Sequence, residues 1–389
     1  MIQKSKQLPS IGLIGGGQLG RMFLQNSSRY GNKVVILEND PQSPAGVLTN
    51  HFIEGNIKDA QAIKTLAEEC DVISYEIEHI NVDALFELEA QGKKVIPSAN
   101  ILKTIQDKGL QKQFYHSNDI PTAPFRLVNQ PNEWVAAMEE LGGTHFAAKS
   151  RTGGYDGKGV LLTDIETVKN DPSIIPFEDG VMIEKFIPCQ KELAVLVAIG
   201  QDGSHAVYPS VDMAFHPISN LVTYLFTPAD INVDLEKRVQ ELALKTVQAF
   251  GGAGLFAVEF FLDNEQKLWV NEIAPRPHNS AHHTIEGSYT SQFDQMFRIL
   301  AGLPLGSTTF RQAAVMVNLV GPEDGEGDYY LDKIEEVLEI EGVYIHMYGK
   351  ITSKPHRKLG HVTIINDSIE KAREIADFVE STLKVKIIC

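Results

Sequence analysis

Cysteine is scarce in this chain of 389 residues, and long apolar runs are missing from it. The three cysteines, Cys70, Cys189 and Cys389, are odd in number, and none is spaced to pair with another as a metal site. A reducing compartment, the cytoplasm, is therefore expected. No run reaches the roughly 18 apolar residues of a membrane helix. The first ten residues are polar and carry Lys4 and Lys6, which argues against a secretory signal.

Positive charge is also in deficit, because the formal net charge is -16. The average field of such a protein repels nucleic acid and anionic membranes, so neither is expected as a partner. A small anionic substrate remains compatible with this charge if its pocket is locally basic. The length predicts two or three domains.

Two kinds of pattern divide the chain. Near the N-terminus, apolar runs alternate with helical stretches, which predicts a parallel sheet with crossover helices. This α/β unit ends near residues 100–105, and Pro121 and Pro124 suggest a linker. Beyond them strands dominate and predict a mixed α+β domain, and a final unit begins near residue 305. The predicted N-terminal strands are 10–15, 33–37 and 71–75, and a later hairpin pairs 254–262 with 267–273.

The first motif is a glycine-rich turn. Gly15, Gly17 and Gly20 form G-x-G-x-x-G after a strand, and Glu38 follows at the end of the next strand. This arrangement is typical of dinucleotide-binding domains. Glycines also let a backbone approach a sugar phosphate at a helix N-terminus. A nucleotide cofactor, a sugar phosphate and a tight turn without a ligand all fit the motif by itself.

The second motif follows Lys149 and contains four glycines between residues 153 and 159. Such a segment is expected to lie close over phosphates, with Lys149 and Lys158 supplying charge. A plain glycine-rich hairpin is the alternative, but it rarely needs interleaved Tyr, Asp and Lys. A strand end at residues 184–187 could read an adenine edge, and Glu192 could hold ribose hydroxyls. A solvated edge strand fits the last two features equally well.

The third motif is a pair of acids, Glu259 and Glu272, on the two strands of the predicted hairpin. Both acids lie within apolar runs, so two like charges would be buried together at a cost. A bridging divalent cation removes this cost, and Mg²⁺ is typically held by one or two carboxylates and substrate phosphates. A solvent-facing hairpin is the alternative. Zinc at His278, His282 and His283 is disfavoured, because no H-E-x-x-H motif accompanies them.

The order of these motifs resembles the ATP-grasp superfamily and, within it, the 5-(carboxyamino)imidazole ribonucleotide synthetase family of purine biosynthesis. The most specific piece is N-E-I-A-P-R-P-H-N-S at residues 271–280, supported by G-G-G-Q-L-G and G-G-Y-D-G-K-G. The resemblance runs over nearly the whole chain. It implies an N-terminal Rossmann-like domain over 1–106, a two-part ATP-grasp domain over 107–304 with a lid at about 122–187, and a C-terminal domain over 305–389.

The family joins bicarbonate to the amine of aminoimidazole ribonucleotide and converts ATP to ADP and phosphate through carboxyphosphate. The resemblance implies a homodimer with small-molecule substrates, ATP and Mg²⁺. Glu259 and Glu272 are expected to hold the metal. The expected ATP contacts are Lys108, Lys149, Gly153, Gly154, Gly157, Gly159, Glu184, Lys185, Phe186, Ile187, Glu192, His216 and Asn271. Residues expected at the ribonucleotide are Gln18, Leu19, Glu76, Asn279, Lys350, Arg357 and Lys358, and those expected at the reacting groups are Tyr155, Asp156, Lys158 and Arg276.

Two positions depart mildly from the family pattern, because Ala281 replaces a usual Gly and Lys108 a common Arg. The nearest alternative is the formate-dependent glycinamide ribonucleotide transformylase of the same superfamily, which tends to have acids at Gln18 and at the Asn279-Ser280 pair. An NAD-dependent oxidoreductase would leave the second and third motifs unexplained. A non-catalytic nucleotide sensor would not need Lys149, Glu259 and Glu272 together.

Overall fold

The N-terminal unit is a parallel sheet covered by helices, as its alternating pattern predicts. The computed structural model describes residues 7–153, 159–177, 180–215 and 222–388. The sheet order is β3-β2-β1-β4-β5, with every pair parallel. The strands are β1 (Ile11–Ile14), β2 (Val34–Glu38), β3 (Phe52–Glu54), β4 (Val72–Tyr75) and β5 (Lys94–Val95), and the helices are α1 (Gln18–Ser27), α2 (Ala60–Glu69), α3 (Val82–Ala90) and α4 (Ala99–Gln106). All four residues of β1 are buried, which explains its continuous apolar run.

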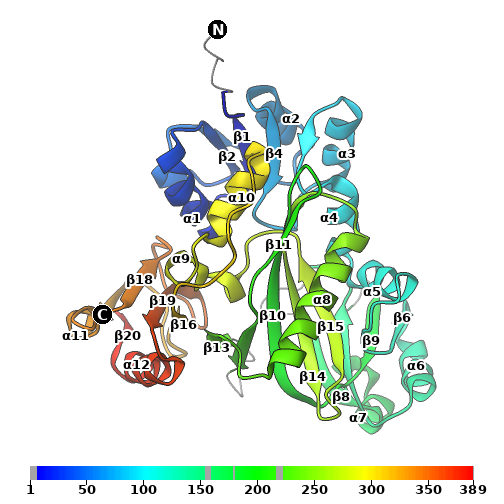
Figure 1. Ribbon diagram of the computed structural model, residues 1–389. Coiled ribbons are helices and arrows are strands. Elements are labelled where there is room, and N and C mark those ends of the chain that lie inside the picture. The colour runs from blue at the N-terminus through cyan, green and yellow to red at the C-terminus, as the bar shows by residue number, and fades with distance from the viewer. Residues whose placement is uncertain (1–6, 154–158, 178–179, 216–221, 389) are drawn as a thin grey trace.

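A small antiparallel sheet follows, in the order β6-β9-β7-β8. Its strands are β6 (Phe125–Val128), β7 (His145–Ser150), β8 (Val160–Asp164) and β9 (Val181–Lys185), accompanied by α5 (Lys108–Ser117), α6 (Trp134–Leu141) and α7 (Ile165–Asn170). Figure 1 shows this sheet beside the central strands, on the side away from the chain's C-terminus. The sheet carries Lys149 at the end of β7, before the glycine-rich segment.

The largest sheet has nine strands, in the order β15-β14-β10-β12-β13-β16-β19-β18, with β11 paired to β10. The strands from the middle part of the chain are β10 (Cys189–Ile199), β11 (His205–Val207), β12 (Val211–Phe215), β13 (Val222–Thr227), β14 (Gly254–Asp263) and β15 (Leu268–Ala274), with helices α8 (Val233–Ala249), α9 (Thr284–Gly287) and α10 (Gln292–Ala301). The apolar stripe of α8, including Val239, Ala243 and Val247, packs with Val195 and Val258 in one core. The predicted hairpin at 254–273 is confirmed by the pairing of β14 with β15.

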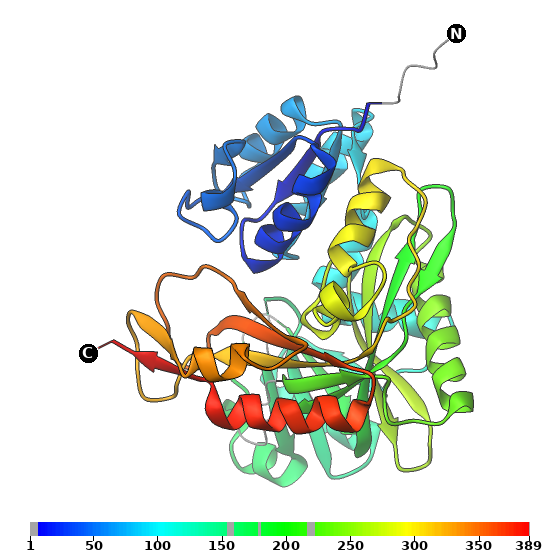
Figure 2. The ribbon, with the colours of Figure 1, turned by 60° about the vertical axis from the view of Figure 1, so that its left-hand side comes forward.

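Three of the five C-terminal strands, β16, β18 and β19, extend the same nine-stranded sheet, because β13 pairs antiparallel with β16, whereas β17 and β20 form a separate two-stranded sheet. The elements are β16 (Ala313–Val320), β17 (Tyr329–Asp332), β18 (Val343–Met347), β19 (Lys358–Asn366), β20 (Lys384–Ile387), α11 (Ile334–Leu338) and α12 (Ile369–Thr382). In Figure 2 these elements lie below the N-terminal sheet. The sheet therefore continues across the predicted boundary between residues 304 and 305, and the domain boundaries stay a prediction.

Helix α10 joins the N-terminal unit to the central sheet (Figure 1). Phe297 on α10 stacks on Tyr30 with ring centroids 4.2 Å apart. Tyr30 also donates its hydroxyl to Asp294 at 2.5 Å, and Arg29 pairs with the same carboxylate at 2.5 Å. These contacts hold α1 and the turn after it at a defined place above the strands that carry the acids.

Candidate functional site

The two acids of the hairpin lie directly opposite each other, because Glu259 on β14 pairs with Glu272 on β15. The next pair is Phe260 with Val270, so Asn271 is the extra residue of a β-bulge. A bulge interrupts the strict alternation of faces. Val270 and Ile273 remain buried in the core, whereas Asn271 and Glu272 are both partly exposed. The bulge thus brings two successive polar residues to the side occupied by Glu259.

The electrostatics of the pair are asymmetric. Burial raises the pKa of Glu259, and the charges of Glu272 and Glu192 raise it further. The ammonium of Lys108 lies 3.0 Å from Glu272, and its charge lowers the pKa of that carboxyl. The Glu272 side chain is still 43% exposed, so it is accessible to solvent. The two carboxylates lie opposite each other and repel each other. Such a pair of hard oxygen donors is suited to a divalent cation such as Mg²⁺.

Lys149 reaches this acid pair from the small sheet. Its ammonium lies 3.2 Å from the Asn271 side-chain oxygen and 2.6 Å from Glu184. The second oxygen of Glu184 pairs with Lys112 on α5 at 2.5 Å. Burial acts to raise the pKa of Glu184, but Lys112 and Lys149 together outweigh it and lower the pKa to about 2. Sequence reasoning missed Lys112, whose only local signal is its place on a polar helix.

The glycine-rich segment begins beside these lysines. Gly153 and Gly159 are described, and the amide of Ser150 donates to the Gly159 carbonyl at 2.8 Å. The predicted residues Gly154, Tyr155, Asp156, Gly157 and Lys158 lie outside the described residues, as does His216. Arg151, which sequence reasoning did not single out, makes two contacts with the Asp107 carboxylate at 2.5 and 3.0 Å. Asp107 also caps α5, so its contacts with Arg151 tie the residue just before the segment to the start of this helix.

The strand end predicted to read an adenine edge has part of its backbone already engaged. The amide of Lys185 donates to Pro124, and that of Phe186 donates to His145. The Glu184 side chain pairs with two lysines, and its expected contact with ATP stays a prediction. Burial raises the pKa of Glu192 to about 7. The contacts of Ile187 and Glu192 with ATP stay a prediction.

The glycine turn of the N-terminal unit is filled by the chain's own carboxylates. Glu76 accepts from the amides of Gly17 at 2.5 Å and Gly20 at 2.9 Å, at the N-terminus of α1. Glu38 accepts from the amide of Gly16 at 3.0 Å. A Cβ added at Gly17 would lie 2.7 Å from a Glu76 oxygen. The glycines therefore admit internal carboxylates, and a sugar phosphate beside this turn stays a prediction.

A basic cluster lies at the start of α1, close to the glycine turn. Lys350 donates to the Gln18 side-chain oxygen at 2.9 Å and to the Lys358 carbonyl at 2.6 Å. Arg357 turns toward Thr352, with its Nη1 2.8 Å from that carbonyl. Leu19 is buried in the core around α1. Lys350 lies in the loop between β18 and β19, Lys358 begins β19 and Gln18 begins the first helix, so the tertiary fold brings predicted ribonucleotide residues together.

Asn279 is held by a reciprocal pair of hydrogen bonds with Asn318 on β16. Each side-chain amide donates to the other's oxygen, at 2.9 and 3.1 Å. Such pairing fixes the orientation of both amides. Asn318 was not predicted, because only the fold shows that β16 passes beneath the 275–280 segment.

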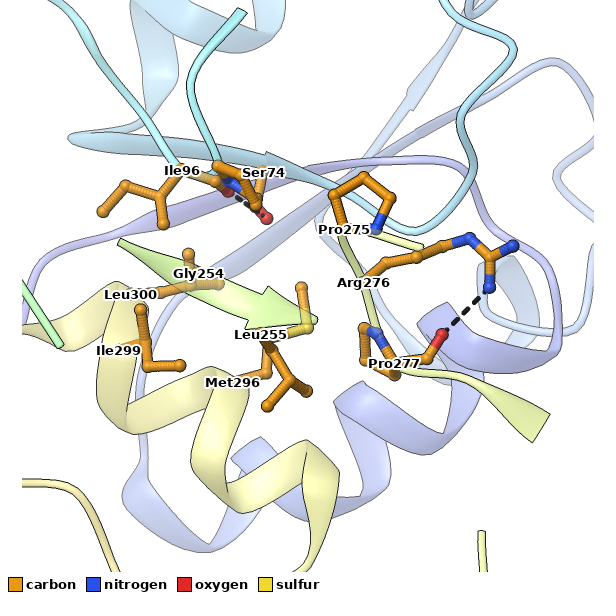
Figure 3. A pocket seen from close by; sticks show the side chains of 11 residues that line it. Ser74, Ile96, Gly254, Leu255, Pro275, Arg276, Pro277, Met296, Ile299 and Leu300 are labelled. Atoms are coloured by element: carbon orange, nitrogen blue, oxygen red, sulfur yellow. Dashed lines mark hydrogen bonds between the residues drawn. The ribbon is translucent and has the colours of Figure 1, made fainter. Parts of the chain in front are cut away.

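Arg276 lies at the junction of the N-terminal unit and the central sheet. It pairs with Glu78 at 2.8 Å and donates from Nη1 to the Pro277 carbonyl at 3.0 Å. Figure 3 shows it at the rim of a narrow crevice that also contains Ser74, Gly254 and Met296. The lining is mainly apolar, and none of the acids or lysines described above belongs to it. The crevice is thus a packing feature between domains, whereas the guanidinium of Arg276 is directed to Glu78.

The three histidines after Arg276 have different surroundings. His278 lies 2.9 Å from the Ser280 hydroxyl and 3.6 Å from Glu259, and burial together with Arg276 lowers its pKa to about 4. The 3.6 Å contact is therefore not an ion pair at neutral pH. His282 stacks on His361 with centroids 4.8 Å apart, and His283 is buried. Within the described part of the chain, no three His, Cys, Asp or Glu side chains are grouped to hold a metal ion.

Three family models match consecutive parts of the chain. They are a ribonucleotide synthetase preATP-grasp domain over 8–106, an ATP-grasp domain over 113–293, and a phosphoribosylaminoimidazole carboxylase C-terminal domain over 314–375. The helices of the described ranges are too short or too polar for a membrane span.

Similar proteins cover almost the whole chain. The phosphoribosylaminoimidazole carboxylase of Ogataea methanolica is 39% identical over 96% of the chain and 69% of its own length. The chain spans about two thirds of such curated relatives, from 64% to 69% in three of them. The crystal structure of the N5-carboxyaminoimidazole ribonucleotide synthetase from Thermotoga maritima is 38% identical, with a TM-score of 0.89 and coverage of 98% of this chain and 100% of that one. A structure from Aspergillus clavatus, in complex with ADP and 5-aminoimidazole ribonucleotide, is 32% identical, with a TM-score of 0.86 and coverage of 96% and 99%.

Proposed function

The chain belongs to the N5-carboxyaminoimidazole ribonucleotide synthetase family of ATP-grasp ligases, and on this premise we propose how its residues perform the reaction. The enzyme is an ATP-dependent carbon–nitrogen ligase of purine biosynthesis that carboxylates 5-aminoimidazole ribonucleotide. Bicarbonate supplies the carboxyl group, and ATP is converted to ADP and phosphate.

The observation that carries the proposal is the opposition of Glu259 and Glu272, with Lys108 and Lys149 beside Glu272 and Asn271. Glu259 and Glu272 would hold Mg²⁺, and Asn271 and the two lysines would face the phosphates. When bound, Mg²⁺ would neutralise charge on the phosphates of ATP. This donor set of oxygens and ammonium groups matches a nucleotide triphosphate better than a nicotinamide cofactor. Glu38 also argues against a nicotinamide cofactor, because its carboxylate accepts a hydrogen bond from the Gly16 amide.

The reaction needs two steps because bicarbonate is a poor electrophile. An oxygen of bicarbonate attacks the terminal phosphorus of ATP, the bond to ADP breaks, and carboxyphosphate forms. The amine of the ribonucleotide then attacks the carboxyl carbon, inorganic phosphate leaves, and the amine loses a proton. Carbon dioxide released in place is an equivalent acceptor for the second step. The ammonium groups of Lys108 and Lys149 stabilise the charge on the transferring group.

Water has to be kept from carboxyphosphate. We assign this task to the segment at residues 153–159, and we assign Tyr155, Asp156, Lys158 and Arg276 to bicarbonate and the amine. Exclusion of water protects a reactive intermediate and strengthens the electrostatic contacts in the site. Gln18, Glu76, Asn279, Lys350, Arg357 and Lys358 are assigned to the ribonucleotide. A homodimer and a cytoplasmic location complete the proposal.

The test compares two substrate pairs in one assay. ADP release is measured with aminoimidazole ribonucleotide and bicarbonate, and then with glycinamide ribonucleotide and formate. Turnover with the first pair alone supports the proposed reaction. Turnover with the second pair alone would assign the chain to the transformylase branch of the superfamily, and magnesium chelation should stop either reaction.

A further inference from the structure

We infer that Lys112 is a positioning residue that neutralises Glu184 and so leaves the positive charge of Lys149 available to the phosphates of ATP. The inference rests on the ATP site proposed above. Lys112 lies on α5, belongs to no motif and has no direct part in the proposed reaction. Its side chain is only 2% exposed, which is unusual for a lysine.

Lys112 is not placed to bind a ligand itself, because its ammonium group already has protein acceptors. An ammonium has three N–H donors. In the structure its nitrogen lies 2.5 Å from Glu184 Oε1, 2.5 Å from the Thr122 hydroxyl and 3.4 Å from the Val270 carbonyl. The Thr122 and Val270 oxygens accept hydrogen bonds from the ammonium, and Glu184 is its ion-pair partner. The group therefore acts inside the protein, on Glu184.

Glu184 lies between two cations and is shielded from water. Its side chain is 3% exposed, with Oε1 paired to Lys112 and Oε2 paired to Lys149 at 2.6 Å. One carboxylate between two ammonium groups leaves one net positive charge. A buried carboxylate has no solvent to share its charge with, so its two partners determine the local balance.

The surplus charge is placed at the end that faces the site. Lys149 is 12% exposed, more than Lys112, and its ammonium also contacts Asn271 at 3.2 Å. Asn271 is the bulge residue next to Glu272, so Lys149 lies where the phosphates are proposed to bind. Without Lys112, the charges of Glu184 and Lys149 would cancel. The ammonium of Lys149 would then neutralise the carboxylate and not the phosphates.

The test uses binding of MgATP and of adenosine, measured by titration calorimetry on the full chain. Lys112→Met should weaken MgATP binding at least about tenfold, as expected for loss of a charge-assisted contact. Adenosine has no phosphate, so its affinity should not change. The double variant Lys112→Met/Glu184→Gln removes both charges, leaves Lys149 uncompensated and should restore MgATP binding to near the wild-type value.

The matched control is Lys245→Met, because exposed Lys245 donates to the Asp119 carbonyl on the outside of α8 and should tolerate the change. Equal weakening of MgATP and adenosine, or a double variant as weak as the single one, would overturn the inference. So would unchanged MgATP binding in Lys112→Met. If Lys112→Met does not fold, the double variant decides by itself, since it should bind like the wild type. Failure of the wild type to bind MgATP would instead refute the proposed function.

Discussion

Glu259 and Glu272 are cross-strand neighbours on β14 and β15, and the Asn271 bulge sets the second acid and an amide side by side. Two acids in this relation repel each other, and burial adds to the cost of charging Glu259. A strand pair shaped only for stability would place apolar or oppositely charged residues here. The arrangement therefore indicates a binding site for a cation, and Lys108 already supplies one positive charge beside Glu272.

Glu272→Gln should lower ATP turnover by about 100-fold or more, since the amide is a poor ligand for a hard cation and loses the pairing with Lys108. The fold should persist, because the Glu272 side chain is partly exposed and does not belong to the core. Steady-state ADP release measures the first expectation, and the thermal midpoint measures the second.

Glu265→Gln is the matched control for that variant, because Glu265 lies exposed in the turn of the same hairpin. It should keep wild-type turnover. Turnover by Glu272→Gln within a few-fold of the wild type would refute the metal assignment.

Lys350→Met should raise the KM for the ribonucleotide by roughly 10- to 100-fold, the range expected when one charge-assisted contact of 1.5–3 kcal/mol is lost. The KM for ATP should change little, because Lys350 contacts Gln18 and Lys358 and not the lysines around Glu184. Initial rates at varied concentrations of each substrate separate the two constants.

Lys354→Met provides the comparison, since Lys354 is exposed and pairs with Glu326 at 3.1 Å. Both variants lower the net charge equally. A similar rise in KM for both would mean that the general field of the C-terminal loop, and not the Lys350 contact, attracts the substrate.

Asn318→Leu removes the reciprocal amide pair and should leave Asn279 without a fixed orientation. We expect the KM for the ribonucleotide to rise about tenfold, corresponding to about 1–1.5 kcal/mol of lost positioning. MgATP affinity, measured separately by calorimetry, should stay unchanged. Equal losses for both ligands would show that the substitution disturbs β16 as a whole.

Asp294→Asn should lower the free energy of unfolding at pH 7 by about 2 kcal/mol, because a buried charged hydrogen-bond acceptor is lost. Burial acts to raise the pKa of Asp294, but Tyr30, Arg29 and Arg298 outweigh it and lower the pKa. The folded pKa is thus below the unfolded value of about 3.9. The stabilisation is present above that unfolded value and is lost as the pH falls through the lower folded-state pKa.

Urea unfolding of both proteins at pH 7 and near pH 3 measures this difference. The gap between wild type and Asp294→Asn should narrow at the acidic pH. A gap of the same size at both values would mean that packing, and not the ionised carboxylate, holds α10 to the N-terminal unit.

Local patterns were sufficient for much of the fold. The alternation of apolar runs and helices predicted the parallel sheet, and the two strands around residues 263–266 predicted the hairpin with its opposed acids. Such elements depend on neighbours a few residues apart, so their signals are contained in short segments. The short strand β12 and the helix α10 were not predicted, since their limits depend on partners far along the chain.

The identities of the acids, lysines and glycines, and the hairpin that opposes Glu259 to Glu272, were determined by the sequence. Only the tertiary structure decided what each charge faces. It placed Glu76 on the glycine turn, Lys112 behind Glu184 and Asn318 against Asn279, pairs separated by between 39 and 72 residues. The physical reason is that burial and pairing depend on long-range packing, which leaves no periodic trace in the sequence.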